Sequence, residues 1–393
     1  MTTQTLSQNT LSKNNDSSKD DESIKVMLVE DSAVVRGMVR KWLEVVPGVK
    51  VVDSAGNGQI AIDKVSSLKP DIIILDIEMP VMDGLTALPV ILQKCPKAKI
   101  LLASTLTKKN AEITLKAMSL GASDYIAKPS FVRDGNDARN EFQQELIRKV
   151  TGLVSRPRLN SAKTSQSLTS SNDTWAPMPD ANASFKFRRK SLIVPKVLAI
   201  GSSTGGPAAL TKLFADLKGK LNNIPVFVTQ HMPPTFTALL GDKLAKIAGI
   251  DGGEAKDNEE IIAGRLYVAP GGFHMRISES NGKKIIKLDE EPPINHCRPA
   301  VDPMLDSVAK YYGNSALVSI LTGMGSDGAK GALKIADKGG TVFAQDEASS
   351  VVWGMPGATA AAGACTALVE IDKMGDKLAM VLNKTNMMTQ RTN

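Results

Sequence analysis

The sequence KVLAIGSSTGG occupies residues 196–206. An apolar strand pattern runs directly into a turn of small residues, and a helix is predicted to begin near Ala208. A serine at the centre of a G-x-S-x-G turn between a strand and a helix lies on a sharp bend with its hydroxyl exposed. Ser203 holds that position here and is a candidate nucleophile. The same glycines also suit a phosphate at the helix N-terminus, which leaves a dinucleotide-binding oxidoreductase as the alternative.

Polar side chains follow two further apolar runs, which predict neighbouring strands of one parallel sheet: residues 225–230 and 316–321. His231 follows the first run, and Asp327 follows the second in a glycine-framed turn. Because parallel strands end at the same edge of a sheet, Ser203, His231 and Asp327 can meet there. They would supply a nucleophile, a general base and the carboxylate that orients the base.

Other residues compete for these roles. Of the 3 histidines, His274 lies in a hairpin-like region and His296 is the third. Asp346 also follows a strand pattern, but Asp327 lies in the tighter turn. The oxidoreductase alternative needs a full G-x-G-x-x-G turn and an acidic residue at the end of the second strand, where the chain has Gln230. These positions favour acyl-bond hydrolysis over cofactor binding.

Another α/β unit is predicted between residues 24 and 150, where short apolar runs alternate with helical patterns. Glu30 and Asp31 follow its first run, and Asp76 ends the run DIIILD at residues 71–76. A single carboxylate at a strand end often caps a helix, but capping does not account for the whole set. Carboxylates that converge on one edge repel one another unless a hard cation such as Mg²⁺ lies among them. Asp76 would then be the nucleophile that takes a phosphoryl group.

Composition limits the remaining function classes. The 393 residues suit two domains, and a hydrophobic content of 42% is enough to fill two cores. No apolar run is long enough to cross a membrane, and the N-terminal residues lack the apolar core of a signal peptide. The 3 cysteines are far apart, which favours reduced thiols. We therefore expect a cytoplasmic protein that is not membrane-inserted, and a monomer.

The net charge of +7 is concentrated in one segment. Residues 151–196 contain eight Lys or Arg and two Asp, a balance of +6, and are rich in Ser, Thr, Asn and Pro. This composition predicts a flexible basic linker, whose end at residues 186–190 would also suit an acidic partner. The folded regions share a balance of only +1, and neither has a helix-turn-helix followed by a basic helix. A DNA-binding effector, or any other nucleic-acid partner, is not expected.

The first unit resembles a two-component receiver domain, which has a flavodoxin-like parallel sheet. The matching segments are Asp76–Pro80 with Met82–Gly84, Ser104, Tyr125 and Lys128–Pro129. The resemblance implies that Asp76 is the phosphoacceptor and that Ser104, Tyr125 and Lys128 form the switch. It also implies a Mg²⁺ cofactor for phosphorylation, held by Glu30, Asp31, Asp76 and the backbone carbonyl of Glu78. Glu30 stands where the family often has Asp.

The second unit resembles the catalytic domain of the chemotaxis protein-glutamate methylesterase/protein-glutamine glutaminase family. That domain is a mainly parallel α/β esterase domain with a β-hairpin. The matching segments are Gly201–Gly206, Gln230–Thr237, Asn295–Asp302, Leu321–Gly328, Gln345 and Gly354–Pro356. The resemblance implies that Ser203, His231 and Asp327 form the triad and that Thr204 and Met324 lie at the oxyanion site. It implies no cofactor for hydrolysis.

Together the two resemblances imply a hydrolase that is activated by phosphorylation of its own receiver. Such an enzyme demethylates glutamate γ-methyl esters, releasing methanol, and deamidates specific glutamines on the cytoplasmic helices of methyl-accepting chemoreceptors, for chemotactic adaptation. A chemotaxis histidine kinase would be the phosphodonor. The expected organisation is a disordered extension, a receiver, a flexible linker, a catalytic domain and a disordered tail: residues 1–23, 24–148, 149–191, 192–385 and 386–393.

Overall fold

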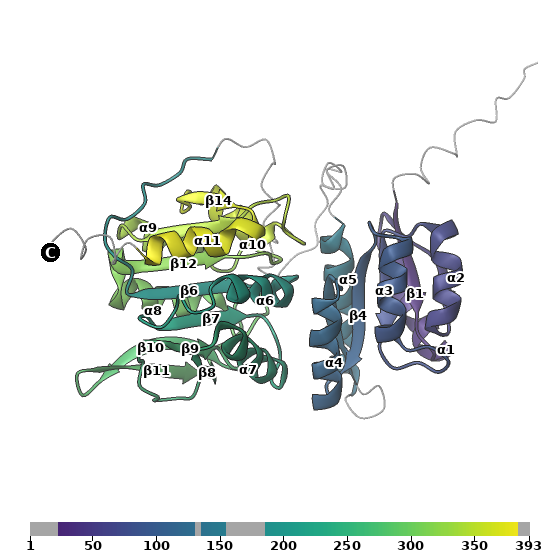
Figure 1. Cartoon of the computed structure of the whole chain (residues 1–393). Helices are drawn as coiled ribbons and strands as arrows, with labels where there is room; N and C mark the ends of the chain where they lie inside the picture. The colour runs from purple at the N-terminus through teal and green to yellow at the C-terminus, as the bar shows by residue number, and fades with distance from the viewer. Residues whose placement is uncertain (1–22, 130–134, 155–184, 384–393) are drawn as a thin grey trace, which may run out of the picture.

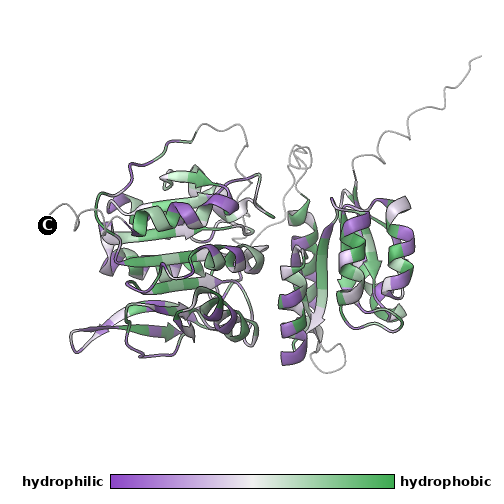
Figure 2. Ribbon diagram, in the orientation of Figure 1, coloured by the Kyte–Doolittle hydropathy of each residue, from purple (hydrophilic) through white to green (hydrophobic). Residues whose placement is uncertain are grey.

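The computed structural model describes residues 23–129, 135–154 and 185–383, which form two α/β domains (Figure 1). The predicted extension before Ser23, the middle of the predicted linker and the predicted tail lie outside the described residues. Figure 2 shows apolar residues along the strands of both sheets and polar residues on the outward sides of the helices. Each domain therefore has its core between its sheet and the covering helices.

The N-terminal domain has a five-stranded sheet in the order β2-β1-β3-β4-β5, and its strand pairs are parallel. Side chains of β3 alternate between the faces: Ile72 and Ile74 pack with α1 and α5, whereas Ile73 and Leu75 pack with α2, α3 and α4. The elements are β1 (Ile24–Val29), α1 (Ala33–Glu44), β2 (Val49–Ala55), α2 (Gly58–Leu68), β3 (Ile72–Asp76), α3 (Gly84–Lys94), β4 (Lys99–Thr105), α4 (Lys108–Ser119), β5 (Asp124–Lys128) and α5 (Gly135–Leu153).

The C-terminal domain has a seven-stranded parallel sheet in the order β14-β13-β12-β6-β7-β9-β8, and a separate antiparallel hairpin of β10 and β11. The expected fold class is confirmed in both domains. The elements are β6 (Val197–Ser202), α6 (Gly206–Asp216), β7 (Val226–Gln230), α7 (Phe236–Ala248), β8 (Asp251–Glu254), β9 (Arg265–Val268), β10 (His274–Ser280), β11 (Lys283–Asp289), α8 (Val301–Tyr311), η1 (Gly313–Ser315), β12 (Ala316–Ile320), α9 (Ala329–Asp337), β13 (Thr341–Gln345), α10 (Gly354–Ala361), β14 (Ala367–Val369) and α11 (Ile371–Leu382).

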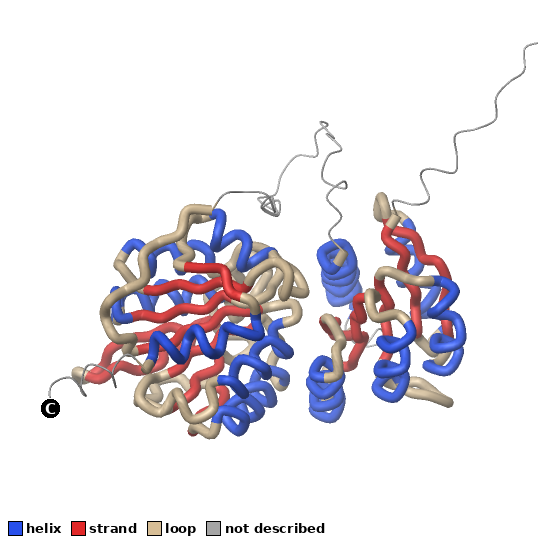
Figure 3. The backbone as a smooth tube through the Cα atoms, turned by 45° about the horizontal axis from the view of Figure 1, so that its top comes forward, coloured by secondary structure: helices blue, strands red, loops and turns tan. Residues whose placement is uncertain are grey.

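Three central strands of the larger sheet lead to one edge. β6 pairs with β12 on one side and with β7 on the other, so Gly201 lies beside Ile320 and Ser202 beside Gln230. Figure 3 shows the strands of this sheet side by side, with helices around them. Because all three strands run in the same direction, the segments that follow them begin at the same edge.

The two domains pack against each other through α4 and α5 of the N-terminal domain, which face the C-terminal domain in Figure 1, and through side chains of β5. Tyr125 on β5 stacks on Phe236 at the start of α7, with ring centroids 4.6 Å apart and an interplanar angle of 12°. Lys243 Nζ on α7 donates to Ser119 Oγ at 2.6 Å. Apolar residues from both domains form one continuous cluster, so the interface is partly an extension of the two cores.

Both ends of the predicted linker belong to folded parts of the protein, which corrects the expected boundaries. α5 continues to Leu153, which is buried. Residues 185–191 lie against the C-terminal domain. The guanidinium of Arg188 pairs with Asp337 at 2.9 Å, and the backbone N–H of Arg188 donates to the carbonyl of Cys365 at 2.8 Å. These contacts are made by backbone groups and by single side chains. The sequence of this segment therefore shows no periodic apolar pattern that would predict them.

Gly84→Ala should destabilise the N-terminal domain, because the added Cβ would lie 2.1 Å from the backbone oxygen of Asp76. We expect the free energy of unfolding to fall by about 1–3 kcal/mol. Gly37→Ala in α1 is the matched control, since nothing lies within 4 Å of its added Cβ. It should stabilise the helix by up to about 1 kcal/mol. Calorimetric unfolding of the full chain measures both changes, and equal unfolding temperatures in the two variants would contradict this packing.

Candidate active site

Ser203 lies on a tight turn between β6 and α6. Gly205 has a φ of 77°, in the left-handed region that favours glycine. The N–H of Ser203 donates to the carbonyl of Thr322 at 3.0 Å, which ties the turn to the segment after β12. Ser202 is fully buried, whereas Ser203 is only partly buried. The turn therefore directs the first serine inward and leaves the central one accessible, as the G-x-S-x-G pattern predicts.

The imidazole of the partly buried His231 and the carboxylate of the buried Asp327 form a pair, with Nε2 and Oδ2 2.8 Å apart. The carboxylate also accepts hydrogen bonds from the N–H groups of Val301 at 2.5 Å, Asp302 at 3.0 Å and Gly328 at 2.9 Å. Burial alone would raise the pKa of Asp327, but its hydrogen bond and charge interaction with His231 and these backbone donors hold the pKa below its ordinary value. Asp327 is therefore ionised and holds the ring of His231 in place.

Ser203 and His231 leave neighbouring strands, and the N–H of His231 donates to the carbonyl of Ser202 at 3.2 Å. Within the described residues, the structure records no hydrogen bond between the Ser203 hydroxyl and His231. Burial lowers the pKa of His231, but the adjacent Cys297 and Asp327 raise it to about 10. The structure thus joins the His and Asp members of the predicted triad, with Ser203 at the next strand end.

The competing candidates have structural contacts instead. His274 is buried, and its Nδ1 accepts from the N–H of Ala300 at 3.2 Å. Asp346 accepts from the N–H of Ser349 at 3.2 Å. Each contact holds a backbone segment in place, and the one to His274 fixes the residue that precedes Val301, whose N–H binds Asp327.

The oxidoreductase alternative is not supported. A Cβ on Gly206 would lie 1.9 Å from Oε1 of Gln230, so this side chain fills the space above the start of α6. Gln230 also stands where a dinucleotide site needs an acidic residue. The glycines of this turn therefore make room for a protein side chain.

Both residues expected at the oxyanion site contact the N-terminal domain. The hydroxyl of Thr204 donates to Oδ2 of Asp124 at 2.8 Å, and Lys149 Nζ lies 2.7 Å from the same oxygen. Met324 packs against α5, where a Cβ on Gly152 would lie 2.2 Å from its terminal methyl carbon. No sequence pattern points to Asp124, Lys149 or Gly152, because their contacts arise only when the domains dock. The N-terminal domain covers this side of the sheet edge.

The predicted carboxylates of the N-terminal domain converge. One oxygen from each of Glu30, Asp31 and Asp76 lies within 4.8 Å of the others. Lys128 Nζ lies 2.7 Å from Asp76 and 3.3 Å from Glu30. Burial raises the pKa of both Asp76 and Glu30, and the charge of Lys128 opposes these shifts. Three carboxylates beside one ammonium leave an anionic set of oxygen donors, which fits Mg²⁺.

Of the three switch residues, Tyr125 contacts the second domain, whereas Ser104 and Lys128 contact groups of their own domain. Ser104 is buried, and its hydroxyl accepts from Thr114 Oγ1 on α4 at 3.0 Å. Tyr125 stacks on Phe236 across the interface, as described above. Lys128 ends the same strand, β5, and contacts Asp76. One strand therefore links the carboxylate cluster to the interface.

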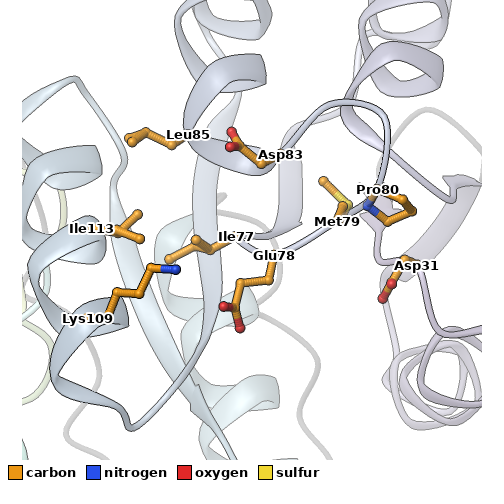
Figure 4. Close-up of a pocket in the computed structure, with 9 residues that line it drawn as sticks. All are labelled: Asp31, Ile77, Glu78, Met79, Pro80, Asp83, Leu85, Lys109 and Ile113. Carbon is orange, nitrogen blue, oxygen red and sulfur yellow. The ribbon is translucent and has the colours of Figure 1, made fainter.

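A pocket of 370 Å³ adjoins the carboxylates, between the turn after β3 and the start of α4 (Figure 4). Asp31 and Glu78 line it, and the ammonium of Lys109 points into it (Figure 4). The side chain of Glu78 accepts from Asn110 Nδ2 at 3.0 Å, which holds this turn against α4. The carboxylate edge is therefore hollowed beside the start of α4.

Asp302→Asn should stabilise the protein in a pH-dependent way. Burial and the charge of Asp327 raise the pKa of Asp302 from 3.8 to about 6. Because native Asp302 holds its proton more tightly than unfolded Asp302, stability falls as pH rises between these values and stays reduced above them. The substitution should add about 1–3 kcal/mol to the free energy of unfolding near pH 8, and less than half of that near pH 4.5. Urea unfolding at both pH values is the measurement. Equal gains in the free energy of unfolding at the two pH values would contradict the raised pKa of Asp302.

Comparison with known proteins identifies both domains. The CheB methylesterase family matches residues 198–378, and the response regulator receiver domain family matches residues 26–137. A protein-glutamate methylesterase/protein-glutamine glutaminase 1 from Rhodospirillum rubrum is 46% identical over 373 residues, which cover 92% of this chain and 95% of that protein. The protein of the same name from Paramagnetospirillum magneticum is 46% identical over 364 residues, covering 90% and 94%.

A solved structure, the Thermotoga maritima CheB methylesterase catalytic domain, is 41% identical, covers 48% of this chain and 100% of its own, and has a TM-score of 0.46. The full-length relatives decide the assignment, because their identity extends along nearly all of both chains. The chain therefore belongs to the protein-glutamate methylesterase/protein-glutamine glutaminase family, with a receiver domain followed by a CheB methylesterase domain.

Proposed function

We propose that the protein is a phosphorylation-activated hydrolase that demethylates glutamate γ-methyl esters on chemoreceptors and deamidates specific glutamines there. The observation that carries the proposal is the pair of His231 and Asp327, 2.8 Å apart, at the sheet edge where the Ser203 turn begins. The shared name of the relatives supports both kinds of side chain as substrates.

Ser203 is the nucleophile in this mechanism. Its hydroxyl attacks the ester carbonyl while neutral His231 takes the proton, and Asp327 stabilises the imidazolium that forms. The backbone N–H groups of Thr204 and Met324 hold the oxyanion. His231 returns the proton to the leaving methanol, and water then frees the glutamate carboxylate. The same steps on a glutamine side chain release ammonia.

The proposed substrates are side chains on the cytoplasmic helices of methyl-accepting chemoreceptors. Each reaction leaves one more carboxylate on a receptor helix, which changes the charge interactions along it. The proposed phosphodonor is a chemotaxis histidine kinase, and the proposed setting is the cytoplasm, where the protein would act as a monomer. In the described part of the chain, no helix is long and apolar enough to cross a membrane.

Mg²⁺ is the proposed cofactor for phosphorylation of Asp76. Glu30, Asp31 and Asp76 would hold it, together with the backbone carbonyl of Glu78, and it would neutralise charge during phosphoryl transfer. Hydrolysis is proposed to use no cofactor.

Phosphorylation is proposed to release the receiver from the active-site edge. A phosphoryl group on Asp76 would compete for Lys128 and attract the hydroxyl of Ser104 away from Thr114. Ser104 lies on β4, Lys128 on β5 and Thr114 on α4. Both β5 and α4 are part of the interface between the domains. Rearrangement there would weaken the contacts that cover Thr204 and Met324 and open this side of the sheet edge to the substrate.

Ser203→Ala should abolish hydrolysis without unfolding the protein, because it removes the nucleophile and nothing else. We expect methanol release from methylated receptor membranes to fall by at least about 10³-fold. Ser202→Ala is the neighbouring control, and its loss should be far smaller because the Ser202 hydroxyl points to Gln230. Similar rates in Ser203→Ala and the wild type would refute the assignment.

Tyr125→Ala should raise the activity of the unphosphorylated full chain. The stack on Phe236 is worth about 0.5–1.5 kcal/mol beyond its buried area, so its loss should favour the open form up to about 10-fold. Lys243→Ala removes one exposed interdomain hydrogen bond and no buried aromatic stack, so it should change the rate less than Tyr125→Ala does. Methanol release without a phosphodonor measures both. An unchanged rate in Tyr125→Ala would show that this contact does not restrain the enzyme.

A further inference from the structure

The amide of Gln230 joins the backbone of the proposed nucleophile to the backbone of the proposed base. Gln230 is the last residue of β7 and is 2% exposed. Its Nε2 donates to the carbonyl of Ser203 at 2.9 Å and to the carbonyl of His231 at 3.3 Å. Its Oε1 accepts from the hydroxyl of Ser202 at 2.7 Å. One planar group therefore spans the ends of two neighbouring strands.

The chemistry of these contacts fixes the orientation of the amide. The carbonyls of Ser203 and His231 only accept hydrogen bonds, so the end that faces them must be the NH₂ group with its two hydrogens. The other end faces the Ser202 hydroxyl, which supplies the donor that Oε1 needs. Each polar atom of this buried side chain is satisfied, which is the usual condition for a rigid polar network.

The surrounding backbone leaves room for this amide and little else. A Cβ on Gly206 would lie 1.9 Å from Oε1 and 2.9 Å from the Cβ of Ser202. The Gly206 N–H also donates to the carbonyl of Ser203 at 2.8 Å, so that carbonyl is held from two sides. β6 and β7, which carry these groups, lie side by side in the sheet (Figure 1).

We propose that Gln230 is a positioning residue that fixes Ser203 relative to His231. This inference rests on the proposed roles of Ser203 and His231. A shift of about 1 Å between reacting groups can lower the rate about 10²-fold. A small displacement of Ser203 relative to His231 would therefore slow the reaction. Gln230 is buried behind both strand ends, and its part in the reaction is to hold the two backbones.

No ordinary substitute supplies the same contacts. Glutamate has the same length, but its carboxylate has no hydrogen to donate and would repel both carbonyls. Asparagine is one methylene shorter, and methionine fills the volume without polar contacts. These differences allow the positioning role to be separated from the simple filling of space.

The main experiment compares Gln230→Met with wild type in the full chain, with Mg²⁺ and a small phosphodonor, on methylated receptor membranes. We expect kcat to fall by about 10–100-fold with KM within about 2-fold, because the loss affects geometry rather than substrate binding. Gln59→Met is the matched control, since it loses only an exposed hydrogen bond to Asp63 of 3.1 Å. Its rate should equal that of the wild type.

Labelling with a fluorophosphonate separates this inference from the proposed function. Mass spectrometry should locate the label on Ser203 in the wild type, and labelling of Gln230→Met should slow as much as its kcat. Labelling elsewhere in the wild type would overturn the nucleophile assignment, and the positioning role with it. Equal labelling rates on Ser203 in wild type and Gln230→Met would overturn the positioning role alone.

Gln230→Glu decides the matter if the methionine variant does not fold. Burial beside two carbonyls favours the protonated form of the new carboxyl, which then regains one hydrogen to donate. The labelling rate of Gln230→Glu relative to wild type should therefore rise by several fold as the pH falls from about 8 to about 6. A ratio near one at both pH values would contradict the proposal.

Discussion

Parallel pairing of β6 with β7 and β12 is the constraint on which the active-site edge depends. It places the segments after the three strands at one edge, where backbone and side-chain hydrogen bonds then lock them together. Asp327 binds the start of α8, Ser203 binds Thr322, and Gln230 binds the ends of β6 and β7. A slip of one residue in either pairing would move every side chain of a strand to the opposite face, so the site and the core require the same register.

The interface between the domains combines apolar packing with one buried charged group. Asp124 accepts from Lys149 of its own domain and from Thr204 of the other. The cost of removing the charges of Asp124 and Lys149 from water offsets most of their attraction. Such a pair therefore adds little net stability, although the loss of one partner is costly. The contact between Asp124 and Thr204 therefore determines the relative orientation of the docked domains more than the strength of their association. Docking of modest strength suits a contact that a single phosphoryl group is proposed to release.

The sequence predicted those features that follow from strand ends. Apolar runs located Asp76 and His231 at strand ends and Asp327 in the glycine-framed turn that follows a strand, because local patterns decide where a buried strand stops. The structure pairs His231 with Asp327 and gathers the predicted carboxylates. The alternation of strand and helix patterns was enough to predict the fold class.

Contacts made by tertiary packing could not be predicted in this way. The hydrogen bond between Asp124 and Thr204, and the packing of Met324 on Gly152, depend on how two domains dock. Gln230 gave only a negative signal, as a missing acid, although its amide holds the two strand ends. The ordered ends of the linker were hidden because backbone hydrogen bonds leave no trace in composition.

The central claim is that the unphosphorylated receiver covers the active-site edge and that phosphorylation uncovers it. Hydrogen–deuterium exchange of the full chain, with and without beryllofluoride and Mg²⁺ as a phosphoryl mimic, tests this claim most directly. The account predicts faster exchange in peptides from both sides of the contact, around Gly152 in α5 and at the start of α7, when the mimic is added. Unchanged or slower exchange in both peptides, with clear protection around Asp76 to show that the mimic is bound, would contradict it.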